Sequence, residues 1–184
     1  ISTDMLYNKE FAVENDSNPI NEYSISKFKA ERYLDNLNAS SLRLAFMGRS
    51  HNKKGFVDWL LNKINSKKEI DLWNNIFSTP LSIKDTLDAI FITINLKIRG
   101  VYNVGSKQQF SKYKFSIELL NKLKISYKNI NVINYINSGE EVFRPLNMSM
   151  NSTKFINLTN WSQPDFSTTI DNIANEYLNE NWKF

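Results

Sequence analysis

The feature that most constrains the fold is the alternation of short apolar segments with amphipathic segments along the chain. Strands are expected near Ile1 and at residues 41–46, 69–73, 100–105 and 130–133. Helices are expected at residues 23–37, 55–65, 84–97, 111–123 and 167–178. Strands that alternate with helices predict an α/β fold with a largely parallel sheet.

Helical spacing of apolar residues also predicts which helix faces are buried. The expected buried positions are Ile25, Phe28, Tyr33 and Leu37 in the first helix, Leu87, Ile90, Phe91 and Ile94 in the third, and Ile170, Ile173, Ala174 and Tyr177 in the last.

Composition excludes several classes of function. The chain has no cysteine, so disulfides, zinc–thiolate sites and cysteine nucleophiles are excluded, and the single histidine, His51, predicts no metal site. The net charge of +4 is spread along the sequence, which argues against nucleic-acid binding. No apolar run approaches the roughly 20 residues of a membrane span, and no signal peptide precedes the first strand. We therefore expect a cytoplasmic protein without a membrane partner.

Tyr23 and Lys27 form a Tyr-x-x-x-Lys pair inside the first predicted helix. The spacing places both side chains on one helix face, one turn apart. A phenol has a pKa of about 10, and a nearby ammonium favours the phenolate, so such a pair can exchange a proton with a carbonyl or alcohol oxygen. The spacing alone is weak, because a surface Tyr–Lys pair on an amphipathic helix fits it equally well.

Thr3 adds a third candidate catalytic group to Tyr23 and Lys27. It stands at the end of the expected first strand and could offer a hydroxyl to the same substrate oxygen. A strand-end hydroxyl, a Tyr-x-x-x-Lys helix and then a strand resemble the order in the extended short-chain dehydrogenase/reductases. The Ser-Thr-Asp triplet at residues 2–4 resembles the dTDP-4-dehydrorhamnose reductase branch in particular. The resemblance implies a Rossmann-type parallel sheet and a small α/β substrate-binding lobe.

Further segments extend the resemblance over most of the chain. They are Leu42-Arg43-Leu44 with Gly48, residues 71–80, the strand 100–105, and Phe143-Arg144-Pro145-Leu146-Asn147 with the short helix after it. The resemblance implies catalytic roles for Thr3, Tyr23 and Lys27. It also implies that Tyr23, Lys27, Ala45, Phe46 and Met47 contact the cofactor, and that Asp4, Met5, Arg144 and Asn147 contact the substrate. An arginine fork suits a diphosphate, although a surface arginine before a rigid proline would look the same.

The chain also departs from the family pattern. Met5 stands where these reductases usually have an aromatic residue, and the five glycines form no dinucleotide-binding fingerprint. We therefore expect a fragment that lacks the Gly-rich cofactor-binding half. Residues 1–50 and 84–106 would complete the Rossmann domain, and residues 51–83 and 107–184 would form the substrate-binding lobe.

The resemblance implies NADP- or NAD-dependent reduction of a nucleotide-linked 4-keto sugar, as in deoxysugar and cell-surface polysaccharide biosynthesis. The implied partner is a nucleotide-sugar substrate, and a homodimer is compatible with it. Two alternatives stay open. One is an epimerase or dehydratase of the same family that uses the same Tyr–Lys pair, and the other is a non-catalytic regulatory homologue.

Overall fold

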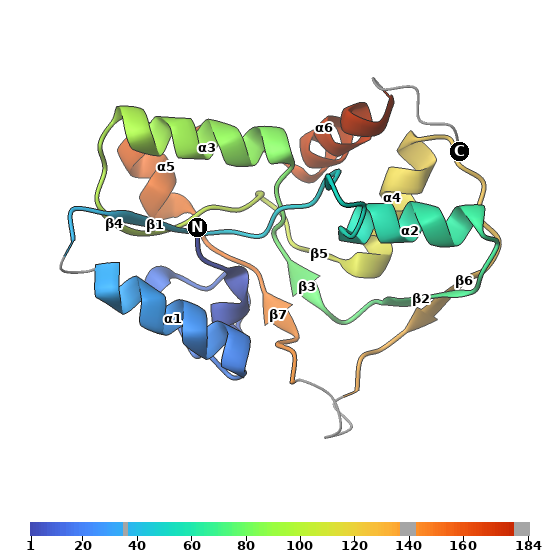
Figure 1. Cartoon of the computed structure of the whole chain (residues 1–184), viewed down its shortest axis with the longest axis horizontal. Helices are drawn as coiled ribbons and strands as arrows, with labels where there is room; N and C mark the ends of the chain where they lie inside the picture. The colour runs from blue at the N-terminus through green and yellow to red at the C-terminus, as the bar shows by residue number, and fades with distance from the viewer. Residues whose placement is uncertain (35–36, 137–142, 179–184) are drawn as a thin grey trace.

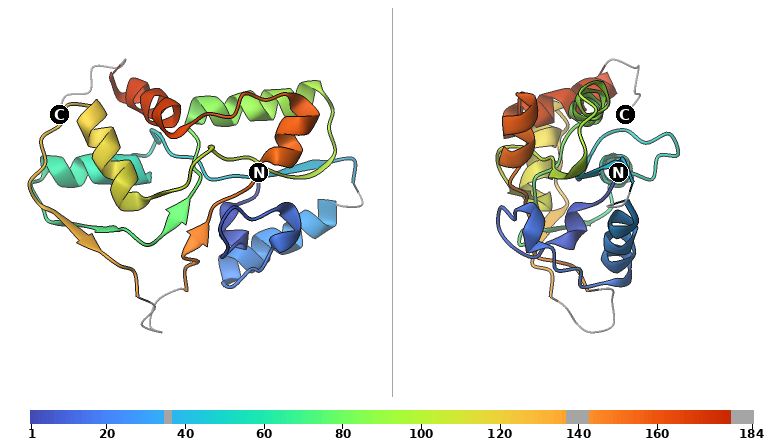
Figure 2. Two further views of the ribbon diagram at one scale, coloured as in Figure 1. Left: turned by 180° about the vertical axis from the view of Figure 1, so that it is seen from behind. Right: turned by 90° about the vertical axis from the view of Figure 1, so that its left-hand side faces the viewer.

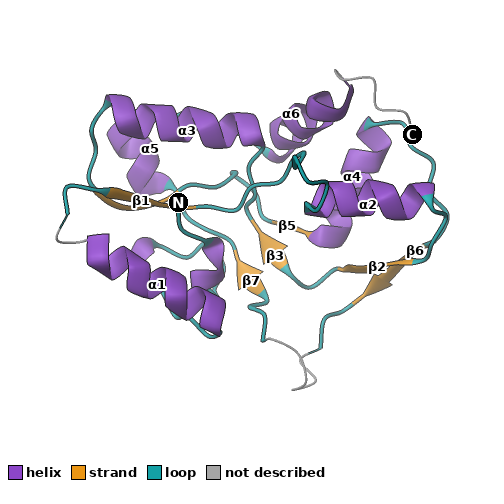
Figure 3. Cartoon of the chain, viewed as in Figure 1, coloured by secondary structure: helices purple, strands orange, loops and turns teal. Residues whose placement is uncertain are grey.

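The strands of the computed structural model form three small sheets in the described part of the chain, residues 1–34, 37–136 and 143–178 (Figure 3). In the first sheet, β1 (Ser40–Arg43) pairs in parallel with β4 (Gly100–Asn103). In the second, β2 (Ile70–Trp73) pairs in parallel with β6 (Ile130–Ile133). In the third, β3 (Phe77–Ser78) lies between β5 (Phe110–Ser111), antiparallel to it, and β7 (Asn147–Met148), parallel to it. The predicted α/β class with mainly parallel pairing is confirmed.

The helices gather around the first two sheets (Figure 1). α1 (Glu22–Leu34) lies on one side of β1 and β4, and α3 (Ile83–Asn95) and α5 (Thr153–Thr159) lie on the other side. α2 (Phe56–Asn65), α4 (Lys112–Lys122) and α6 (Phe166–Leu178) lie together on one side of β2 and β6. None of the described helices is long and apolar enough to cross a membrane.

Two hydrophobic clusters hold these groups of elements together. The larger cluster joins α2, β2, α4 and α6, with Leu60, Leu72, Phe115, Leu119 and Ile173 almost completely buried. The smaller cluster joins β1, α3, β4 and α5. Figure 2 shows the two groups side by side along the longest axis. The domain division expected from the sequence places most of each cluster in one unit and stays a prediction.

The first strand expected from the sequence is wrong in detail. Residues 1–3 belong to no strand, and a short 3-10 helix, η1 (Asp4–Leu6), follows them; a second one, η2 (Glu14–Asp16), lies in the next loop. The Ser2 N–H donates to the Leu42 carbonyl at 2.8 Å. The segment therefore still lies beside β1, but the turn into η1 ends the pairing after one hydrogen bond.

Two of the expected buried faces are wrong in part, although Ile25 and Phe28 in α1 and Ile90 in α3 are half-buried. α1 ends at Leu34, and Tyr33 and Leu37 are 78% and 61% exposed. In α3 the buried residues are Asp85, Thr86, Ala89 and Thr93, whereas Leu87, Phe91 and Ile94 face outward. The face expected for α6 is confirmed, because Ile170, Ile173, Ala174 and Tyr177 are all buried.

Candidate active site

Thr3 and Asp4 lie at the start of η1, and both are buried. Thr3 has extended backbone and is the N-cap of η1, since its Oγ accepts a hydrogen bond from the Met5 N–H at 3.2 Å. The Thr3 hydroxyl donates to the Asp4 carboxylate at 3.4 Å. The hydroxyl and the carboxylate are therefore held together next to the edge of β1.

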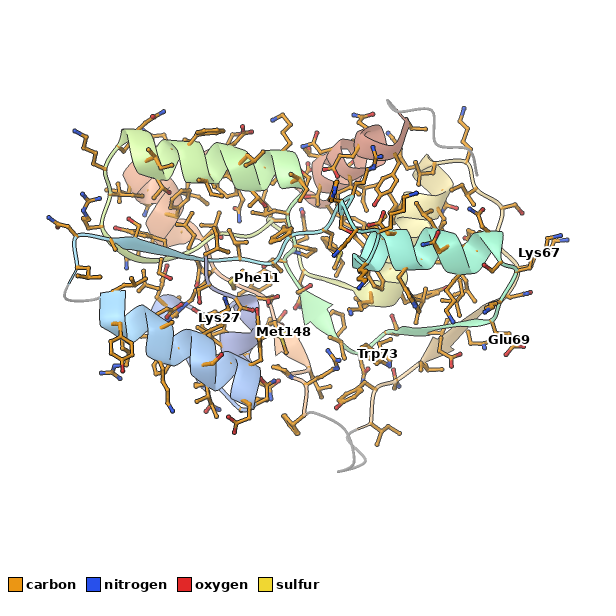
Figure 4. The ribbon with its side chains drawn as sticks, viewed as in Figure 1. Phe11, Lys27, Lys67, Glu69, Trp73 and Met148 are labelled. Atoms are coloured by element: carbon orange, nitrogen blue, oxygen red, sulfur yellow. The ribbon has the colours of Figure 1, made fainter. Side chains whose placement is uncertain are left out.

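Tyr23 and Lys27 lie one turn apart on α1, which packs against η1. The Lys27 Nζ is 6.0 Å from the centre of the Tyr23 ring, and Figure 4 shows Lys27 near the middle of the helix. Tyr23 is 48% exposed. Thr3 and Tyr23 share no direct hydrogen bond within the described residues, but their two elements are in contact.

A buried charge network holds α1 in this position. The Arg43 guanidinium of β1 forms a salt bridge with Glu31 of α1 at 2.5 Å, with both side chains about 95% buried. The same guanidinium donates to the Tyr7 hydroxyl at 2.6 Å, and Tyr7 donates to Asn103 of β4 at 2.7 Å. Burial raises the pKa of Tyr7, which therefore stays a neutral hydrogen-bonding group. The network fixes the helix that presents Tyr23 relative to β1, β4 and the loop after η1.

Asp4 lies in an unusual electrostatic environment. Burial raises the pKa of its carboxyl to about 7, although the Thr3 hydroxyl and the positive charge of Lys112 act in the opposite direction. Asp4 is therefore close to half-protonated at neutral pH, next to the hydroxyl that sequence analysis assigned to catalysis.

Lys112 and Arg144 bring two positive charges to one aromatic ring. The Lys112 Nζ lies 5.2 Å from the centre of the Trp73 ring and 4.8 Å from that of Phe56, and the Arg144 Cζ lies 5.5 Å from that of Trp73. Burial lowers the pKa of Lys112, and the charge of Arg144 lowers it further. Figure 4 shows Trp73 where β2 ends.

A pocket of about 310 Å³ opens beside this cluster. Its lining residues are the aromatic Phe56, Trp59 and Trp73, together with Leu72, the basic Lys54 and Lys112, and the acidic Asp71. The aromatic walls suit a flat ligand, and the lining carries charges of both signs.

Comparison with known proteins identifies the family. The model of the RmlD substrate binding domain matches residues 1–179. The chain belongs to the RmlD substrate-binding domain family. No curated protein sequence matches the chain.

Solved structures support the fold of this RmlD-family chain. A dTDP-4-dehydrorhamnose reductase from Bacillus anthracis, in complex with NADP, has a TM-score of 0.83 at 18% identity, over 94% of this chain and 63% of that one. A second reductase of this name, from Clostridium acetobutylicum, has a TM-score of 0.82 at 22% identity, over 94% and 62%. A dTDP-glucose 4,6-dehydratase from Bacillus anthracis, in complex with NAD, has a TM-score of 0.75 at 18% identity, over 98% and 61%. The chain thus spans less than two thirds of the length of these proteins, and the family resemblance is confirmed.

Three of the five residues predicted to contact a cofactor, Ala45, Phe46 and Met47, follow β1. Ala45 and Met47 exchange backbone hydrogen bonds with Leu81, at 2.9 and 2.8 Å, so the chain continues in an extended form beyond β1. Met47 packs against the larger hydrophobic cluster, whereas Phe46 is 55% exposed. Phe46 is therefore the one of the three whose side chain is free to contact a ligand.

The other residues predicted to contact the substrate, Met5, Arg144 and Asn147, differ in their surroundings. Met5 is half-buried beside Asp4, and Arg144 is exposed apart from its contact with Trp73. The Asn147 side chain is engaged within the protein, since it donates to Gln109 at 2.9 Å and accepts from the Ser149 hydroxyl at 2.7 Å. These roles stay predictions, and the contacts of Asn147 indicate that it shapes the loop before α5.

Lys112, Phe56 and Trp73 were not predicted as site residues. Lys112 is 108 positions from Asp4, and its local sequence does not distinguish it from the other lysines of the chain. The only local signal is its place directly after Ser111, the N-cap of α4. The described residues hold no group of three or more His, Cys, Asp or Glu side chains that could bind a metal ion.

Proposed function

We propose that this chain forms the catalytic and substrate-binding part of an NAD(P)-dependent reductase that acts on a nucleotide-linked 4-keto sugar. The observation that carries the proposal is the packing of α1, with Tyr23 and Lys27 one turn apart, against η1, with Thr3 at its start. Membership of the RmlD family and similarity to reductases of this name support it.

Each of the three residues has a proposed role. The hydroxyl of Tyr23, a half-exposed residue, gives a proton to the oxygen of the substrate carbonyl as that oxygen becomes an alkoxide. The Thr3 hydroxyl, fixed by its bonds to Met5 and Asp4, positions the same oxygen. The Lys27 ammonium supports the charge of the phenolate and holds the ribose of the cofactor.

The residues present fit one end of a nicotinamide cofactor. Lys27 on α1 and the exposed Phe46 after β1 are available to it. When bound, this cofactor supplies the hydride. Two of the similar structures are described as complexes with NADP or NAD. The glycines of this chain form no pyrophosphate-binding turn, so we propose that the rest of the cofactor is held outside residues 1–184.

Asp4 favours a second candidate function, sugar-nucleotide dehydration. A carboxyl group with a pKa of about 7 can both give and take a proton near neutral pH. It lies next to Thr3, and a dTDP-glucose 4,6-dehydratase is among the similar structures. A dehydratase needs a further acid–base group besides Tyr23, and Asp4 is the candidate.

Substitution of Tyr23 tests the proposal in the longest natural polypeptide that contains this chain. Tyr23→Phe keeps the ring and removes the hydroxyl, so turnover with 4-keto sugar nucleotides should fall by about 100- to 10,000-fold. Binding of NADPH should change little. The measurement is NADPH oxidation against a panel of 4-keto sugar nucleotides, with loss of water from 4-hydroxy sugar nucleotides followed in parallel.

Tyr33→Phe is the matched control, because Tyr33 lies on the same helix and is 78% exposed. It should leave turnover unchanged. Reduction that survives Tyr23→Phe would refute the mechanism. Dehydration without reduction would select the second candidate, and a lack of either activity in the wild type would favour the regulatory homologue.

A further inference from the structure

Glu176 on α6 holds the chain just beyond the segment expected at the cofactor. Its carboxylate accepts a hydrogen bond from the Arg49 backbone N–H at 2.9 Å. The two residues are 127 positions apart, and Arg49 comes three residues after Phe46. The backbone N–H of Ile83, the first residue of α3, also stabilises this carboxylate. Glu176 therefore joins the chain after β1, the start of α3 and α6.

The segment around Phe46 is held at both of its ends. On one side, Ala45 and Met47 exchange backbone hydrogen bonds with Leu81. On the other side, the bond from Arg49 to Glu176 fixes the chain where it leaves this pairing. The Phe46 side chain is 55% exposed, so few protein contacts orient its ring. The direction of the ring therefore depends on how firmly the backbone of this segment is held.

Glu176 approaches this chain most closely at Gly48. A Cβ atom at Gly48 would lie 2.5 Å from the Glu176 Oε2 and 2.8 Å from the Ile83 Cγ1. Both distances are well below the roughly 3.5 Å of an ordinary contact between heavy atoms. Glycine at position 48 thus allows the carboxylate to reach the Arg49 N–H.

The position of Glu176 is unfavourable for folding. Burial raises the pKa of its carboxyl, and the charges of Asp85 on α3 and Asp58 on α2 raise it further, whereas the N–H groups of Arg49 and Ile83 act in the opposite direction. Its Oε1 is buried without a hydrogen-bond partner among the described residues. Groups of this kind are concentrated at functional sites, so we looked for the role of Glu176 in what it holds.

We propose that Glu176 is a positioning residue of the cofactor site, which fixes the segment 45–49 through the Arg49 N–H and thereby orients the Phe46 ring toward the nicotinamide end of the cofactor. This inference rests on the proposed function and adds a residue that was not predicted from the sequence. Glu176 itself does not need to touch the cofactor, because its effect passes through the backbone of Arg49.

The test is direct binding of NADPH, measured by calorimetry on the longest natural polypeptide that contains this chain. Glu176→Ala removes the acceptor and should weaken binding about 5- to 20-fold, which is part of what the loss of a charge-assisted hydrogen bond can cost. Glu176→Gln keeps an oxygen that can accept from Arg49, so its affinity should stay within about threefold of wild type.

Hydrogen exchange without cofactor gives a second measurement. The Arg49 amide should exchange faster in Glu176→Ala than in wild type, because its acceptor is gone. In Glu176→Gln its exchange should stay slow. Unchanged exchange of this amide in Glu176→Ala would mean that Glu176 does not hold the segment, and would overturn the inference.

Two further variants test the path of the effect. Gly48→Ala keeps the charge of Glu176 but forces the carboxylate away from the chain, so it should weaken NADPH binding about as much as Glu176→Ala. In a Phe46→Ala background, Glu176→Ala should weaken binding by less than about twofold, because residues that act through one another are not additive. A full additional loss in that background would show that the effect does not pass through Phe46.

Asp171→Asn is the matched control. Asp171 lies on the same helix, and its salt bridge to Lys122 of α4, at 2.6 Å, is another contact of α6. Because this pair is half-exposed, its loss should change NADPH affinity by less than about twofold. Equal weakening by Asp171→Asn and Glu176→Ala would reduce the effect to a general loosening of α6 and overturn the inference. A well-folded Glu176→Ala variant with wild-type affinity would also overturn it, and if Glu176→Ala does not fold, Gly48→Ala decides by the same criterion.

These outcomes are separate from those of the proposed function. NADPH binding that depends on Glu176 in a protein without reductase activity would support the positioning role and reject the reductase. Tyr23-dependent reduction with NADPH binding that ignores Glu176 would keep the reductase and reject the positioning role.

Discussion

Asp4 shows how one residue can be unfavourable for folding and useful for chemistry. Its carboxyl group is buried with the Thr3 hydroxyl as its side-chain hydrogen-bond donor, and its pKa is about 7. Ionised, it opposes folding, because burial disfavours the charged form. A buried acid with a strongly raised pKa is typical of sites that handle protons.

The raised pKa of Asp4 predicts how stability depends on pH. A folded-state pKa above the unfolded value means that the folded protein binds more protons between about pH 4 and pH 7. The contribution of Asp4 is therefore most favourable below about pH 4 and is lost as pH rises through about 7. Asp4→Asn removes this term, so it should raise the melting temperature at pH 8 and change it little at pH 4.

The measurement is thermal unfolding of wild type and Asp4→Asn from pH 4 to pH 8. Each pKa unit corresponds to about 1.4 kcal/mol, so the rise of the Asp4 pKa from 3.8 to about 7 should give a gain at pH 8 on the order of 4 kcal/mol. Asp16→Asn is the contrasting control, because its hydrogen bond from Lys9 lowers the pKa of that carboxyl at the surface. A lower melting temperature for Asp4→Asn at pH 8 would show that the folded state needs the carboxylate.

At the scale of elements, the position of α1 depends on polar contacts, since few of its apolar residues are buried. Its buried residues are Ser24 and Glu31, and Glu31 is paired with Arg43 of β1. Removing one partner of a buried ion pair leaves an uncompensated charge. Glu31→Gln should therefore destabilise the protein by about 3 to 5 kcal/mol.

Urea unfolding measures this cost. The control is Asp88→Asn, which breaks the exposed Lys84–Asp88 pair of α3 and should cost no more than about 0.5 kcal/mol. If α1 indeed depends on the pair, Glu31→Gln should also weaken any activity that needs Tyr23. Equal small losses from both substitutions would mean that α1 is held by its other contacts.

The helices also show what sequence patterns can and cannot predict. The stripe of α6 was correctly predicted, because apolar residues occupy one of its faces only. The buried face predicted for α3 was wrong at Leu87, Phe91 and Ile94, because polar residues share the inward face with Ala89 and are hydrogen-bonded there. There Asp85 accepts hydrogen bonds from the Ser82 hydroxyl at 2.5 Å and from the Asn172 amide at 3.0 Å. A periodicity rule ranks side chains by hydrophobicity and cannot anticipate partners 87 residues away.

Because a local pattern cannot anticipate contacts between distant residues, only some of the site residues could be predicted from the sequence. Tyr23 and Lys27 are neighbours on one helix, so local spacing was enough to propose them. Lys112 and Trp73 meet only through the folding of α4 against β2, and nothing in their local sequence marks that contact. Site residues that are neighbours on one helix could be predicted from the sequence. Residues that are far apart in the sequence and meet only in the folded protein could not.

At the scale of the whole molecule, one apolar surface has no cover within the described residues. Leu87, Phe91 and Ile94 on α3 are 45%, 58% and 62% exposed, and Ile1 is 63% exposed. A groove of about 570 Å³ between α3 and β1 is lined partly by Ile1, Leu42, Ile90 and Ile94. Contiguous exposed apolar surface of this kind is typical of an interface.

We propose that a partner domain covers this surface, packing on α3 and extending the sheet at β1. The chain spans about 63% of the Bacillus anthracis reductase, and this proposal is tested on the chain alone. Residues 1–184 expressed alone should then self-associate or aggregate, because an open sheet edge and an apolar helix face are both exposed. Light scattering coupled to size exclusion should report particles larger than the 21.5 kDa monomer.

Substitutions on α3 separate this explanation from general instability. Phe91→Lys combined with Ile94→Lys should reduce self-association without unfolding the chain, because both side chains already face outward. Leu158→Lys is the control on α5, where the side chain is 50% exposed but lies away from the groove, and it should leave self-association unchanged. Light scattering of the α3 double variant and of the α5 control shows which of the two surfaces causes self-association. A monodisperse wild-type monomer with a cooperative melt at high temperature would show that residues 1–184 need no partner, and that the apolar face of α3 is compatible with an independent fold.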